Sequence, residues 1–109
     1  MKNPQGFFDF NQPSFRGTIQ EKFEAFHALN PRVYQHLVRM TRQLKDRGRS
    51  KMGIGMLFEV LRWEYYMTTE DTTSEFKLSN SYRSRYARLI MKQEPDLAGI
   101  FNTKELRSE

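Results

Sequence analysis

The residues of this chain that could do chemistry are two histidines and a short acidic stretch near its C-terminal end. His27 and His36 have no carboxylate beside them at metal-ligand spacing, so neither gains the orienting partner that a metal ligand or a general base needs. Glu94 and Asp96, with Lys104 downstream, suggest a metal-dependent nuclease, in which converging carboxylates hold a divalent cation beside a lysine. The order does not fit, because no acid lies two residues before this lysine to share a strand face with it. We therefore predict no enzyme activity, no metal site and no cofactor.

The basic residues are more informative, because they gather in two stretches of the sequence. The whole net charge of +5 lies between Arg39 and Lys51, where six bases accompany one acid. The stretch from Lys77 to Lys92 holds five more bases and no acid. Such a separation creates a directed field that a polyanion feels beyond contact distance. The residues predicted to contact nucleic acid are Arg39, Arg42, Lys45, Arg47, Arg49, Lys51, Lys77, Ser81, Arg83, Arg85, Arg88 and Lys92.

Each basic stretch has a functional and a structural interpretation. Residues 81–92 are predicted to form a helix with a cationic face opposite an apolar one. Small polar residues and arginines at its start are typical of a helix that contacts base edges in the major groove of DNA. Exposed bases on a solvated face, however, need no function. Residues 47–51 are predicted to form a flexible connection that could bind phosphates through its basic side chains and backbone N–H groups. Basic residues near a helix C-terminus, however, also offset the negative end of the helix dipole. Since the pI is near 9.7, we favour nucleic acid, and double-stranded DNA first.

Four helices are predicted to carry these side chains. Thr18 to Glu21 spells a capping box, so the first helix runs from about Ile19 to Leu29. Asn30 is predicted to cap a second helix that begins with proline and ends near Gly48. A fourth helix reaches about Gln93, where the following proline ends it. The predicted class is therefore a mainly α, compact helical domain.

The third helix and a short β element complete the predicted fold. From Ile54 onward, two apolar stripes lie on different faces, and the second contains Met56, Val60, Trp63 and Met67. A helix that is apolar on two sides is predicted to be central. Residues 76–78 alternate like a strand that could pair with residues 100–106. Such a two-stranded element beside an arginine-rich helix would fit a helix-turn-helix or winged-helix-like domain.

Length and composition limit the number of domains and the location of the protein. With 109 residues and 38% hydrophobic residues, the chain can build one domain, predicted to span residues 18–109. Residues 1–17 read as an extended arm whose aromatic residues dock on the domain itself or on a partner through Phe7, Phe8 and Phe10. The sequence has no cysteine, no apolar run that could cross a bilayer and no signal-peptide pattern. We therefore expect a cytoplasmic protein.

Two segments carry a resemblance to known proteins. Met52 to Trp63 (MGIGMLFEVLRW) and Phe76 to Phe101 (FKLSNSYRSRYARLIMKQEPDLAGIF) resemble a family of small uncharacterised proteins encoded by bacteriophages and prophages. The likeness covers about residues 23–107. It implies no residue roles, but it implies a context in which small proteins serve as DNA-binding regulators, as accessories of DNA metabolism or as inhibitors of host enzymes.

Two hypotheses follow for function. The first is a nucleic-acid-binding protein that acts through its basic patches, with a two-fold dimer as the common form of helix-turn-helix proteins of this size. The second is a protein-interaction module, such as an inhibitor of a host defence or nucleic-acid enzyme, which would use the basic face and the aromatic arm on an acidic partner. A single DNA footprint that uses both basic stretches requires them to share one face of the folded domain.

Overall fold

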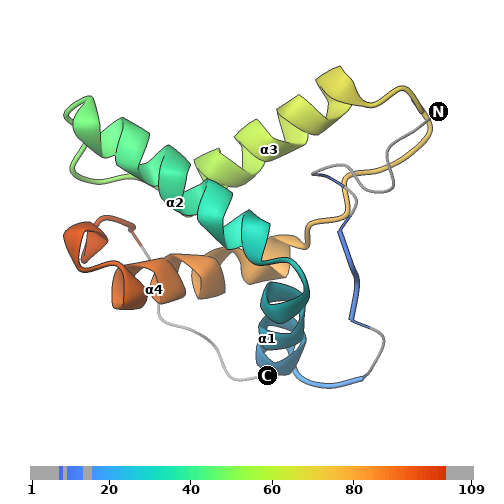
Figure 1. Ribbon diagram of the computed structural model, residues 1–109, viewed down its shortest axis with the longest axis horizontal. Coiled ribbons are helices and arrows are strands. Elements are labelled where there is room, and N and C mark those ends of the chain that lie inside the picture. Colours follow the sequence, from blue (N-terminus) through green and yellow to red (C-terminus); the bar gives the residue numbers. More distant parts are fainter. Residues whose placement is uncertain (1–7, 9, 14–15, 103–109) are drawn as a thin grey trace.

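The computed structural model describes residues 8, 10–13 and 16–102 of the chain. This part is mainly helical, as predicted, with α1 (Ile19–Leu29), α2 (Pro31–Asp46), α3 (Ile54–Thr68) and α4 (Arg83–Gln93) (Figure 1). Two short 3₁₀ turns, η1 (Asn80–Tyr82) and η2 (Pro95–Leu97), precede and follow α4. None of the described helices is both long and apolar enough to span a membrane.

The helix boundaries follow local sequence signals. The hydroxyl of Thr18 accepts a hydrogen bond from the Glu21 backbone N–H (3.1 Å), and the Glu21 carboxylate accepts one from the Thr18 N–H (2.9 Å). This confirms the predicted capping box. At the end of α2, Gly48 takes a φ of +99°, a conformation that suits glycine after a helix C-terminus. Asn30 alone separates α1 from α2, but its side chain does not cap α2.

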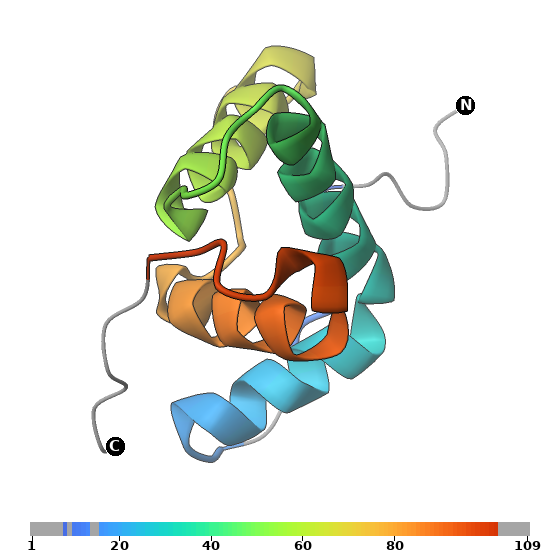
Figure 2. The same cartoon turned by 90° about the vertical axis from the view of Figure 1, so that its left-hand side faces the viewer.

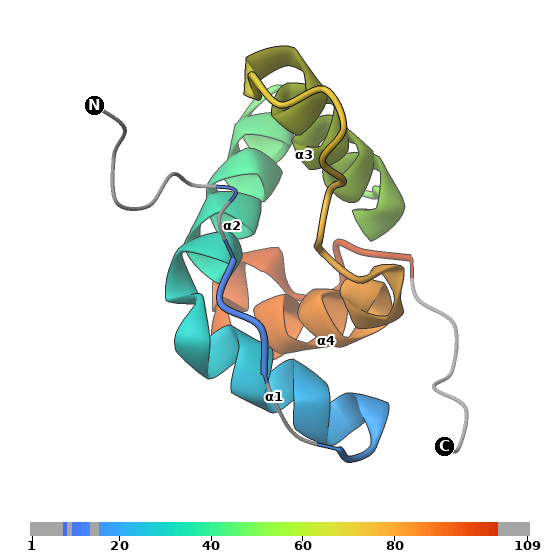
Figure 3. The ribbon, with the colours of Figure 1, turned by 90° about the vertical axis from the view of Figure 1, so that its right-hand side faces the viewer.

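The helices pack around α4. Figures 2 and 3 show α3 and α1 at opposite ends of the molecule with α4 between them, while α2 runs along one side. The buried face of α4 presents Tyr86, Ala87 and Ile90 to the other helices. Tyr86 meets Phe23 of α1 edge to face at 4.8 Å between ring centroids and lies near Phe58 of α3 at 6.2 Å. One continuous core therefore joins the helices on both sides of α4.

The described part of the N-terminal arm packs against the domain itself. The Phe8 ring lies 5.6 Å from Tyr65 of α3, and the Phe10 ring lies 5.7 Å from Phe26 of α1. Asn30 is buried and accepts a hydrogen bond from the Asn11 backbone N–H while donating one to the Asn11 carbonyl, both at 2.8 Å. Phe8 and Phe10 therefore dock on the domain itself, the first of the two predicted alternatives, and are half-buried there; Phe7 lies outside the described residues.

The predicted β pairing is absent from the described part of the chain. Residues 76–78 form no strand, and the Phe76 ring packs against Phe8 and Phe10 of the arm. Instead, the end of the described chain pairs with Met52. The Met52 N–H donates to the Ile100 carbonyl, and the Met52 carbonyl accepts from the Asn102 N–H, both at 3.0 Å. The predicted partner strand lies partly in residues 103–106, outside the described range.

The helix-turn-helix expectation is also not confirmed. That motif joins its two helices by a turn of about three to four residues, whereas residues 47–53 connect α2 to α3 and residues 69–82 connect α3 to α4.

The prediction that α3 is central is wrong. One face packs through Leu57, Phe58 and Leu61, but the second apolar stripe is on the surface, where Trp63 is 63% exposed.

Candidate nucleic-acid interface

The outward face of α4 and the adjacent side of α1 form a groove of about 370 Å³. Since Arg85, Arg88 and Lys92 are spaced three and four residues apart, they share one side of α4, opposite its buried residues. From α1, the groove is lined by Gln20, Phe23, Glu24 and His27. Three cations therefore stand along one wall, and Glu24 is the single carboxylate among the described lining residues.

Hydrogen bonds fix part of this groove. Arg85 donates through Nε to the side-chain oxygen of Gln20 at 3.1 Å and through Nη1 to the Ser81 carbonyl at 3.4 Å. Gln20 in turn donates to the Glu24 carboxylate at 2.9 Å. Both of these acceptors are neutral groups, and Arg85, Arg88 and Lys92 place three cationic side chains on the α4 wall of the groove.

His27 lies on the α1 side of the groove. Its ring stacks on Phe23 at 6.1 Å with the planes nearly parallel, and burial lowers the pKa of the imidazole below its ordinary value of 6.5. His27 is therefore neutral at neutral pH, and the positive charge of the groove belongs to α4.

Arg83 points to the opposite side of α4 from this groove. Its guanidinium donates to the Glu59 carboxylate of α3 at 3.0 Å and lies 5.7 Å from the centre of the Phe58 ring. A Cβ added to Gly55 would stand 3.4 Å from this guanidinium, so the glycine leaves room for the arginine. The predicted nucleic-acid contact by Arg83 is not supported, because this side chain joins α4 to α3.

Several bases of the first stretch bind the turn that follows α4. Arg42 donates to the Asp96 carboxylate at 2.9 and 3.0 Å and to the Glu94 carboxylate at 2.8 Å, which lowers the pKa of Asp96 below its ordinary 3.8. The Lys45 ammonium donates to the Asp96 carbonyl, and the Lys51 ammonium donates to the Gly99 carbonyl at 2.8 Å. These three predicted phosphate contacts therefore have intramolecular partners: Arg42 and Lys45 hold α2 to η2, and Lys51 joins the α2–α3 connection to the segment after η2.

Glu94 makes a second link between the same elements. The Tyr34 hydroxyl of α2 donates to its carboxylate at 2.8 Å, and burial together with this bond raises the pKa of Tyr34. Glu94 and Asp96 thus lie beside α2, where Tyr34 and Arg42 bind their carboxylates. These two acids therefore offset part of the positive charge of the first basic stretch.

The remaining predicted contacts are dispersed. Arg47 lines a groove between α2 and α3, and Arg39 is exposed on α2 with Nη1 3.2 Å from a ring nitrogen of His36. Arg49 lines a depression beside Gly48 and Ser50. Lys77 is exposed in the connection between α3 and α4, and Ser81 is exposed in η1. Of the predicted set, Arg85, Arg88 and Lys92 therefore line the α1–α4 groove, and Lys45 and Arg49 line the depression beside Gly48.

The α1 wall of the groove was not predicted from the sequence. Gln20, Glu24 and His27 are common surface residues of an amphipathic helix, and no spacing signal connects them to residues more than 50 positions away. The described residues contain no group of three or more His, Cys, Asp or Glu side chains placed to hold a metal ion. Comparison with protein-family models, curated proteins and solved structures finds no match to this chain.

Proposed function

We propose that this chain is a small phage-type regulatory or accessory protein of the cytoplasm that binds nucleic acid, and duplex DNA first, through the outward face of α4. The observation that carries the proposal is the alignment of Arg85, Arg88 and Lys92 along one groove wall. Seven residues of helix rise by about 10 Å, so the three cations extend along the groove and can contact more than one phosphate of a nucleic-acid backbone.

The contacts are directed mainly to the phosphate backbone. A base-reading helix presents the side chains of its N-terminal turn to the groove, but Arg83 at the start of α4 is held by Glu59. The N–H of Ser81 in the preceding turn already donates to the Ser79 hydroxyl at 3.1 Å. Backbone contacts carry little sequence information and depend steeply on salt, so we expect weak sequence preference and strong salt dependence.

A charge-matched pair of variants tests this proposal. Binding of a fluorescently labelled duplex is followed by anisotropy over a series of salt concentrations for the wild type, for Arg85→Gln/Arg88→Gln and for Arg39→Gln/Lys77→Gln. Each variant loses two positive charges, but only the first loses them from the α1–α4 groove. The slope of log affinity against log salt should fall by about 2 for the groove variant and remain near the wild-type slope for the control.

Two results would contradict the proposal. Equal loss of affinity in both variants would mean that net charge, and not this groove, attracts the duplex. Absence of binding by the wild type at the lowest salt would remove nucleic acid as the partner. Circular dichroism of each variant verifies that the helices are intact, so a loss of binding is not a loss of fold.

A further inference from the structure

The outer face of α3 carries a continuous apolar stripe that no described element covers. Met56, Val60, Trp63 and Met67 are 48%, 38%, 63% and 64% exposed. Their spacing of four, three and four residues places them on one side of the helix, and Tyr66, 50% exposed, lies beside them. A contiguous apolar patch of this kind on a domain marks an interaction surface rather than an ordinary scatter of exposed residues.

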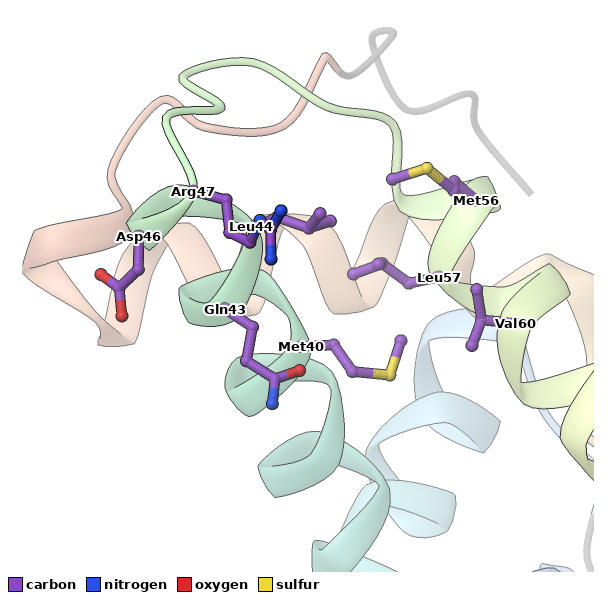
Figure 4. Close-up of a pocket in the computed structure, with 8 residues that line it drawn as sticks. All are labelled: Met40, Gln43, Leu44, Asp46, Arg47, Met56, Leu57 and Val60. Carbon is purple, nitrogen blue, oxygen red and sulfur yellow. The ribbon is translucent and has the colours of Figure 1, made fainter.

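A groove lies beside one end of this stripe. It encloses about 630 Å³ between α2 and α3 and shares Met56 and Val60 with the stripe. In Figure 4 the Met40 side chain reaches from α2 toward Leu57 and Val60, while Asp46 points away from α3. The apolar surface therefore has two different ends: a recessed end at Met56 and Val60, and a protruding end at Trp63 and Met67.

We propose that this surface pairs with the same surface of a second copy of the chain, α3 against α3 in antiparallel orientation. The spacing of the stripe is that of the a and d positions of a coiled coil. An antiparallel two-fold arrangement places Trp63 and Met67 of each copy over Val60 and Met56 of the other. The protruding end of one copy then fills the groove of its partner, and the symmetry makes this contact twice.

Charge favours the antiparallel orientation over the parallel one. In coiled-coil terms, Glu59 and Tyr66 lie at g positions and Leu57 and Glu64 at e positions beside the seam. A parallel pair would bring Glu59 against Glu64 of the other copy, twice. The antiparallel pair brings g positions together, so Glu59 meets Tyr66 of the other copy, while Leu57 is buried in its own core and Glu64 stays beside His36 of its own chain. Glu64 also approaches the groove end that Arg47 lines in the second copy.

The self-association is independent of the proposed binding of nucleic acid. The exposed stripe lies on α3, at the opposite end of the molecule from α1 (Figure 3). Both copies would therefore keep the α1–α4 groove open. Failure of either proposal leaves the other standing, because one is measured with nucleic acid and the other without it.

Sedimentation of the full chain and its intrinsic fluorescence test this pairing together. The wild type should sediment with twice the 13.1 kDa mass of one chain. Trp63 is the only tryptophan, so its emission should shift to the blue as the protein concentration rises and the dimer buries its ring. Met67→Lys should remove both the dimer and the emission shift. Leu29→Glu, a matched control at a 47% exposed apolar residue of α1, should leave both unchanged.

Cross-linking tests the orientation, because the chain has no cysteine of its own. A mixture of the Met56→Cys and Met67→Cys chains should form the mixed disulfide, whereas each chain alone should form little. A wild type that remains monomeric with concentration-independent emission would overturn the proposal. Three other results would also overturn it: a dimer that persists in Met67→Lys, preferential disulfide formation between two Met56→Cys chains, or an emission shift of Trp63 that occurs only when a different protein is added. Trp63→Glu, at another exposed position, repeats the test if Met67→Lys alters the helical content.

Discussion

Arg42 of α2 grips Asp96 of η2 through two parallel hydrogen bonds, from Nε to Oδ2 at 2.9 Å and from Nη2 to Oδ1 at 3.0 Å. This fork connects residues 54 positions apart in the chain. It also assigns a structural role to a base that the charge pattern alone predicts to contact phosphate. The same pair makes the stability of the domain sensitive to acid.

We predict that Asp96→Asn lowers the melting temperature at neutral pH but not in strong acid. The folded-state pKa of Asp96 is lowered, first by the hydrogen bond from Arg42, so its contribution is present above the unfolded value of 3.8 and is lost as the pH falls through the folded value. Thermal melts of both proteins across this range should converge below pH 3.8. Since both partners are nearly half exposed, the difference at neutral pH should be small. A difference that persists in acid would contradict the assignment.

Tyr86→Phe should raise stability by about 1 kcal/mol. The Tyr86 side chain is fully buried in the core, and its hydroxyl has no hydrogen-bond partner among the described residues. Removing the hydroxyl eliminates an unsatisfied polar group and retains the ring that packs on Phe23. Chemical denaturation measures the change. Tyr86→Leu is the control that removes the ring, and it should destabilise the protein. A destabilised Tyr86→Phe would mean that the hydroxyl has a partner.

Gly48→Ala should cost about 1 kcal/mol of folding free energy, because alanine resists the positive φ that Gly48 adopts after α2. Gly53→Ala is a matched control in the same connection. Gly53 has an extended backbone, and no heavy atom beyond its chain neighbours lies within 4 Å of an added Cβ. This control should be neutral or slightly stabilising. Equal effects of the two changes, measured by denaturant unfolding, would exclude the conformational explanation.

Phe10→Ala should destabilise the domain by about 2 kcal/mol, less than for a fully buried phenylalanine because Phe10 is half-buried. The loss comes from the contacts of its ring with Phe26 and Phe76. Phe10→Leu retains part of the apolar contact and should lose less. An unchanged melting temperature for Phe10→Ala would indicate that the arm contributes nothing to the fold.

The helices of this protein could be predicted because their signals are local. The capping box at Thr18, the proline after Asn30 and the glycine at position 48 act within a turn of the residues that carry them. The apolar spacing on α4 likewise identifies its buried face. These features depend on backbone geometry and hydrophobic periodicity, which neighbouring residues determine on their own.

The sequence could not assign partners to its polar and apolar surface residues. In the sequence, nothing distinguishes Arg42 and Arg83 from the neighbouring basic residues. Their carboxylate partners come from elements that pack beside them, η2 for Arg42 and α3 for Arg83. Trp63 has the spacing of a core residue but faces outward, because the side of α3 that packs on the other helices presents Leu57 and Leu61. Amphipathic spacing defines which residues share a face, and tertiary packing decides which face is covered.

The same distinction applies to the candidate site. The sequence by itself determined that Arg85, Arg88 and Lys92 lie together opposite an apolar face, since three- and four-residue spacing fixes this on any helix. Only the tertiary structure decided that α1 forms the second wall of their groove and that Glu94 and Asp96 pair with Arg42 of α2. Contacts between distant segments depend on how the whole core packs, and no local pattern encodes them.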